Sequence, residues 1–224
     1  RRWRKRYMGD DRLRSSHFHH PHKRGFMFIL KSNAYHTFWL GRYFTRLQHL
    51  CDALPFQDDA TAIAFSHAFC LPAYDASSLN ELLYDPLQPV SLEAQRKTIW
   101  NNVQELRGVL HSQSYAELHS LIQTETPDFT YIFQTVNDCT DIFEAEHQDI
   151  FLFFSLGKAI EQLDANLRLQ QTITANLVVI EDLMHFLDDL GWQAVSQTWQ
   201  ELKTCPDLAH LHRFHDQLSV HFKG

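Results

Sequence analysis

The chain has 224 residues, 44% of them hydrophobic, which is typical of a globular protein with a sizeable core. Only seven Gly and seven Pro are spread over it, which disfavours a turn-rich β architecture and favours long helices. Residues 1–26 hold nine of the 20 Lys and Arg and only two of the 27 Asp and Glu. The rest of the chain therefore carries a net charge near −14. This negative charge disfavours nucleic acid and anionic membranes as partners.

The basic segment 1–26 has no periodic apolar positions around which it could fold. We expect a disordered leader, with Met27 as the natural start of the protein; a basic arm that binds nucleic acid is the alternative. The apolar run Phe26–Leu30 is too short for a signal-peptide core, and no run approaches the length of a membrane span. The chain is therefore expected to be a soluble protein that does not bind a membrane.

Helix start and stop signals then predict an all-α fold of about eight or nine helices. Ser32 or Asn33 is the expected cap of the first helix, and Ser91 caps a long helix after a turn with two prolines. Ser114-x-x-Glu117 is the pattern of a capping box, and Pro127 stands at a first-turn position. The predicted segments are 33–53, 59–70, 77–84, 91–110, 114–123, 127–146, 148–171, a helix from Thr172 or Thr174 that Gly191 closes, 192–203 and 207–222.

One helical segment occurs twice. The stretch Phe38–Leu47 returns 116 residues later as Phe154–Leu163, with four identical positions and the apolar residues in one helical register. This similarity predicts a duplication, with residues 27–224 forming one domain of two related halves at about 33–123 and 127–222.

The same segments resemble the alpha-E family of uncharacterised bacterial all-helical proteins. The resemblance rests on Phe38-Trp39-Leu40-Gly41-Arg42-Tyr43, the proline turn 84–92 and the second helix with Gly157-Lys158, and it covers about 33–171. It implies a Glu-Arg pair four residues past each glycine. Here the first copy has Thr45-Arg46 and the second Glu161-Gln162, so each keeps one half of the pair. The family's Arg-Glu-Asn-x-Arg run is represented by Asn102 and Arg107.

Charged residues also follow one line on the second of these helices. Glu161, Asp164 and Arg168 follow Gly157 at helical spacing, and Arg46 of the first copy is expected to meet Glu161 within ion-pair distance. A Glu-Arg pair contains no nucleophile, and Arg stays protonated, so the first interpretation is a structural or ligand-positioning cluster. The predicted members are Arg42, Arg46, Lys158, Glu161, Asp164, Arg168, Asn102 and Arg107.

Other catalytic chemistry has little support in the sequence. The glycine motifs of phosphate-binding loops and nucleophile elbows are absent, so no cofactor is expected. Four widely spaced Cys without a C-x-x-C predict a reducing cytoplasm. Among 15 His, the candidates for a metal site are Glu144 and His147, spaced as in di-iron bundles, with Asp207-x-x-His210 as the nearest second pair; surface side chains are the expected interpretation.

The resemblance implies a place in a predicted bacterial peptide synthesis or modification system. We therefore expect a non-catalytic helical component that binds a peptide or a partner enzyme, either an ATP-grasp ligase or a transglutaminase-like protein. The alternative is an enzyme that uses the polar cluster of Glu161, Asp164 and Arg46, with or without a metal ion held by Glu144 and His147. Residues 108–157 contain eight Asp and Glu and no Lys or Arg, which indicates either a solvated acidic face or a docking surface for a cationic partner.

Overall fold

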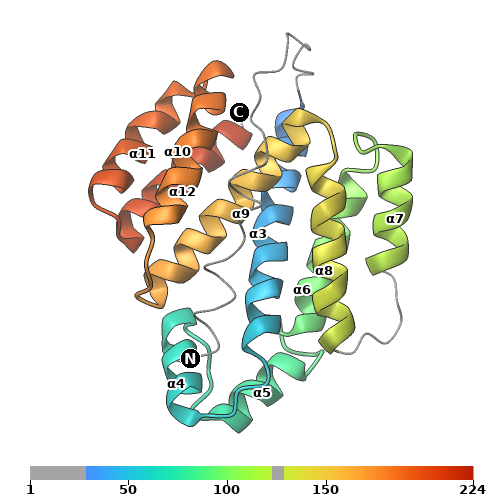
Figure 1. Ribbon diagram of the computed structural model, residues 1–224, viewed down its shortest axis with the longest axis vertical. Helices are drawn as coiled ribbons and strands as arrows, with labels where there is room; N and C mark the ends of the chain where they lie inside the picture. Colours follow the sequence, from blue (N-terminus) through green and yellow to red (C-terminus); the bar gives the residue numbers. More distant parts are fainter. Residues whose placement is uncertain (1–28, 123–128, 224) are drawn as a thin grey trace.

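The computed structural model describes residues 29–122 and 129–223 (Figure 1). The expected leader 1–26 and Pro127 lie outside these residues. The described residues form ten α-helices and no strand, which confirms the all-α fold, with more helices than the eight or nine expected. The helices are α3 (Lys31–Ala53), α4 (Asp59–Phe69), α5 (Ala76–Tyr84), α6 (Leu92–Glu105), α7 (Ser112–Ile122), α8 (Phe129–Glu144), α9 (Gln148–Arg168), α10 (Thr174–Asp189), α11 (Gln193–Thr204) and α12 (Leu208–Lys223).

Local capping chemistry explains several of the helix boundaries. The side chains of Asp75 and Ser91 accept hydrogen bonds from the first turns of α5 and α6, and the cap at Ser91 is the one expected from the sequence. Gly191 lies just past α10 with φ +84°, the left-handed conformation that glycine adopts without strain.

Three predicted boundaries are wrong. α3 begins at Lys31 after Leu30, so Ser32 and Asn33 lie inside the helix and neither caps it. α6 ends at Glu105 and not near Leu110, because the backbone changes at Leu106 to a series of short turns. α7 begins at Ser112, so Ser114 lies inside the helix and caps nothing. The carboxylate of Glu146 instead accepts the backbone N–H of His111 at 3.2 Å, and a distant acidic side chain thus satisfies the N-terminal end of α7.

The long helices α3 and α9 cross in the middle of the fold, and the other helices lie around them (Figure 1). Two hydrophobic clusters form on either side of this crossing. Leu40, Phe44 and Leu47 of α3 pack into the first cluster with α4 to α8, and Phe38 packs into the second with α9 to α12. α8, predicted to belong to the second half, contributes to the first cluster through residues that include Phe143. The relationship between two halves stays a prediction.

Candidate functional site

Two glycines allow the backbones of α3 and α9 to touch. A β-carbon at Gly41 would lie 2.1 Å from the carbonyl oxygen of Phe154, and one at Gly157 would lie 2.0 Å from the carbonyl oxygen of Phe38. Real β-carbons do not approach oxygen this closely, so neither position admits a larger residue without movement of the helices. The contact is reciprocal, since each glycine meets the carbonyl three residues before the other. This crossing fixes the relative positions of the charged side chains that follow on both helices.

Glu161 is at the centre of the charged cluster, and its side chain is only 5% exposed. Arg46 donates two hydrogen bonds to it, from Nε to Oε1 at 2.6 Å and from Nη2 to Oε2 at 3.1 Å. Arg42 donates a third, from Nε to Oε2 at 2.8 Å. The ion pair expected between Arg46 and Glu161 is therefore present, and Arg42 completes a carboxylate held between two guanidinium groups.

Asp164, one turn further along α9, extends the cluster. It accepts hydrogen bonds from Arg42 Nη2 at 3.4 Å and from Arg168 Nε at 2.7 Å. Arg168 also donates to the carbonyl oxygen of Ala68, which ties the end of α9 to α4. The cluster thus contains three Arg and two carboxylates, an excess of one positive charge.

The electrostatics of the cluster follow from its burial and its pairing. Burial acts to raise the pKa of Glu161, but the charges of Arg42 and Arg46 outweigh it and the pKa is lowered. For Arg46, burial acts to lower the pKa, but Glu161 prevails and the pKa is raised. The guanidinium of Arg42 lies over the ring of Trp39 at 5.1 Å, and that of Arg46 over Tyr43 at 5.4 Å. Glu161 and Arg46 therefore both stay charged at neutral pH.

The other predicted members lie outside this cluster. Lys158 forms an ion pair with Glu144 at 2.9 Å. The Oδ1 oxygen of Asn102 in α6 accepts a hydrogen bond from His36 Nδ1 at 3.0 Å, in the tautomer that carries the proton on Nδ1. Arg107 lies over the ring of Tyr115 at 5.5 Å.

Glu144 and His147, the candidates for a metal site in the sequence, contact different partners. Glu144 is bound to Lys158, whereas His147 precedes α9 and lies against the ring of His111, with ring centroids 4.2 Å apart. In the part of the chain that the structure describes, neither Glu144 nor His147 belongs to a group of three possible metal ligands.

Sequence reasoning missed one residue beside the cluster. His215 of α12 packs against Phe38 and Trp39, with ring centroids 6.0 and 5.6 Å away. Its Nε2 atom is buried and has no hydrogen-bond partner among the described residues. Burial and the charge of Arg42 lower its pKa. Nothing in the sequence pairs His215 with α3, because the two segments are far apart in the chain.

A comparison with models of protein families shows the family to which the chain belongs. Residues 30–205 match the model of Alpha-E, described as a predicted alpha-helical domain with a conserved ER motif. The chain belongs to the Alpha-E family. No match was found among curated proteins or solved structures. At the two places where the resemblance predicts this motif, the chain has Thr45-Arg46 and Glu161-Gln162, and the crossing of α3 and α9 brings Arg46 and Glu161 together in one ion pair. None of the helices in the described residues is both long and apolar enough to cross a membrane.

Proposed function

We propose that this Alpha-E protein is a non-catalytic helical component of a bacterial, cytoplasmic system for peptide synthesis or modification. In this role it binds a peptide or a partner enzyme such as an ATP-grasp ligase. The observation that carries the non-catalytic part is that Glu161 and Asp164 each receive two guanidinium groups. A carboxylate that is paired with two guanidinium groups is a poor base, and Arg does not release its proton. The cluster is therefore suited to holding two helices together.

The binding role is assigned to the acidic surface of α7 and α8. A groove of about 660 Å³ lies between these helices, and exposed Glu117 and Asp141 are among the residues that line it. The stretch 108–157 contains no Lys or Arg that could neutralise them locally. Charge complementarity favours a partner that presents Lys or Arg, and we propose a positively charged surface of the ligase as the occupant.

A binding experiment tests this proposal. Isothermal titration calorimetry would measure the affinity of the full chain for an ATP-grasp ligase encoded beside it in the genome. We expect the affinity to fall as the salt concentration rises. The double variant Glu117→Gln, Asp141→Asn should bind about threefold to tenfold more weakly than the unmodified chain, since exposed ion pairs contribute up to about 1 kcal/mol each.

The matched control carries Asp182→Asn and Asp189→Asn, which remove two exposed charges from α10. It should keep the affinity of the unmodified chain. Equal weakening by both double variants would show that only net charge matters and that the groove is not the docking surface. Absence of any binding by the unmodified chain would remove the ligase as the partner.

A further inference from the structure

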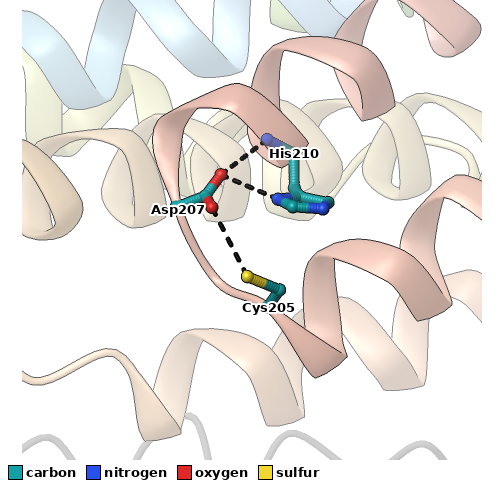
Figure 2. Close-up of side chains that lie close together, drawn as sticks. All are labelled: Cys205, Asp207 and His210. Carbon is teal, nitrogen blue, oxygen red and sulfur yellow. Dashed lines mark hydrogen bonds and ion pairs between the residues drawn. The ribbon is translucent and has the colours of Figure 1, made fainter.

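The turn between α11 and α12 gathers three different metal-ligating side chains, those of Cys205, Asp207 and His210 (Figure 2). Their ligand atoms all lie within 4.8 Å of one another. The Cys205 thiol donates to Asp207 Oδ2 at 3.4 Å, and His210 Nδ1 lies 2.8 Å from Asp207 Oδ1. Within residues 29–122 and 129–223, no other three Cys, His, Asp or Glu side chains come together in this way.

The backbone holds these side chains in place before any ion arrives. The N–H of Asp207 donates to the carbonyl oxygen of Cys205 at 3.0 Å, a three-residue turn around Pro206. The proline ring fixes φ at the centre of this turn, so little conformational freedom remains to be lost. The N–H of His210 donates to Asp207 Oδ1 at 2.8 Å, which orients the carboxylate. The thiol and carboxylate are exposed, and the imidazole is half-buried, so an ion can reach all three.

The donor set decides which ion fits. Thiolate and imidazole ligands select zinc-class transition ions, whereas Ca²⁺ and Mg²⁺ prefer oxygen ligands alone. We propose that Cys205, Asp207 and His210 form a binding site for a divalent ion of the zinc class. Zn²⁺ is bound by four ligands in tetrahedral geometry, so three protein ligands leave one position for water or an exogenous ligand.

The protons balance on binding. The thiol of Cys205 loses its proton to solvent as the metal–sulfur bond forms, and the hydrogen bond from sulfur to Asp207 is replaced by ligation of the carboxylate. In neutral His210 the proton that Nδ1 donates to Asp207 Oδ1 moves to Nε2 by exchange with solvent, and the lone pair left on Nδ1 then binds the ion. One Zn²⁺ therefore replaces one proton, and the three ligands need only small movements.

The site is independent of the family motif and of the proposed docking groove. The match to the Alpha-E model ends at residue 205, so Asp207 and His210 lie beyond it. α11 and α12 lie on the opposite side of Figure 1 from α7 and α8.

Titration of the full chain with Co²⁺, a spectroscopic substitute for Zn²⁺, tests the proposal. Thiolate-bound Co²⁺ gives a charge-transfer absorption band in the near ultraviolet, to which sites made only of His do not contribute. We expect this band at one equivalent of Co²⁺, and its loss on addition of Zn²⁺. Cys205→Ser should abolish this band. His210→Ala should weaken Co²⁺ binding by about tenfold or more, because even the loss of a residue that only supports a metal ligand lowers metal affinity by at least about that factor.

Cys70→Ser is the matched control, because Cys70 is the other exposed cysteine of the described residues. It should keep the band and the affinity, with circular dichroism confirming that every variant remains helical. Three results would overturn the proposal: no band at millimolar Co²⁺, a band that disappears with Cys70→Ser, or unchanged affinity in His210→Ala. The last result would show a bare thiol that binds metal without its neighbours.

Discussion

Gly157 and Phe38 touch through their backbones, and a β-carbon at Gly157 would lie 2.0 Å from the carbonyl oxygen of Phe38. We predict that Gly157→Ala destabilises the protein by about 1–3 kcal/mol, because the two helices must separate to admit the methyl group. Helix propensity alone predicts the opposite sign, since Ala is favoured over Gly by up to about 1 kcal/mol inside a helix. Urea unfolding followed by circular dichroism would measure the change.

Gly108→Ala provides the control for this prediction, because nothing lies within 4 Å of a β-carbon built at Gly108. It should leave the free energy of unfolding within about 0.5 kcal/mol of the original value, as surface substitutions usually do. A stabilising Gly157→Ala would mean that α3 and α9 do not touch at this point.

A second prediction concerns the unequal partners of the central ion pair. Glu161→Gln leaves buried Arg42 without its main carboxylate and should cost about 3–5 kcal/mol, as for other broken buried pairs. Arg46→Met should cost less, about 1–2 kcal/mol, because Glu161 keeps Arg42 and because the Arg46 side chain is 35% exposed. A double-mutant cycle in denaturant measures both values. The pair should cost less than the sum of the single changes, and strict additivity would contradict coupling between them.

The third prediction tests the relationship between the two copies of the signature helix. At the offset of 116 residues, Thr45 corresponds to Glu161 and Gln162 to Arg46. Because the glycine contact is reciprocal, positions 45 and 162 should face each other as 161 and 46 do. Thr45→Glu alone should destabilise the protein by burying an unpaired carboxylate, and adding Gln162→Arg should recover at least about 1 kcal/mol.

Thermal unfolding of the two single variants and the double variant measures this recovery. Gln104→Arg in place of Gln162→Arg serves as the control, since it adds the same charge at a half-buried position of α6, where the neighbouring Asn102 contacts His36 and not the part of α3 around position 45. If both arginines recover the same stability, the gain comes from net charge and the predicted symmetry is wrong.

A fourth prediction follows from the buried imidazole of His215. Burial and the charge of Arg42 hold its pKa below the ordinary value of 6.5, although Asp216 and Asp164 act in the opposite direction and His212 in the same one. As the pH falls below about 6.5, the unfolded chain takes up a proton before the folded one does. The free energy of unfolding should therefore decrease on acidification in this range, in addition to the loss below about pH 4.5 that the lowered pKa of Glu161 produces.

The substitution His215→Phe removes this proton and the unpartnered nitrogen while keeping the aromatic contacts. We expect a flatter stability profile between pH 8 and pH 5 and a gain in stability at the acidic end, measured by urea unfolding at each pH. His185→Phe, at an exposed position of α10, controls for the loss of a histidine. An unchanged slope in His215→Phe would assign the acid sensitivity to other groups.

The sequence predicted those features of the fold that depend on local chemistry. Apolar residues at helical spacing and the caps Asp75 and Ser91 lie within one or two turns of the positions they determine, so they can be recognised without the structure. The start of α7 could not be recognised in this way. Its first turn is satisfied by Glu146, which lies 35 residues further along the chain.

The candidate site was predictable only where the repeat placed two helices against each other. That argument brought Arg46 to Glu161, but it did not show that Arg42 shares the carboxylate. Lys158 has the chemistry of Arg42 at the equivalent position, yet it reaches Glu144 instead. Side-chain direction at the end of a long flexible residue depends on packing, and the sequence pattern contains no information about it.

The crossing of α3 and α9 also constrains how the protein can be made. These helices are separated by more than 90 residues of chain, so a ribosome must synthesise α4 to α8 before α9 emerges to cover α3. Until then Arg42 and Arg46 have no carboxylate from α9, and the apolar face around Phe38 stays exposed. Nascent chains that end before Arg168 therefore expose an apolar, positively charged helix, and at this stage of synthesis they depend on chaperones.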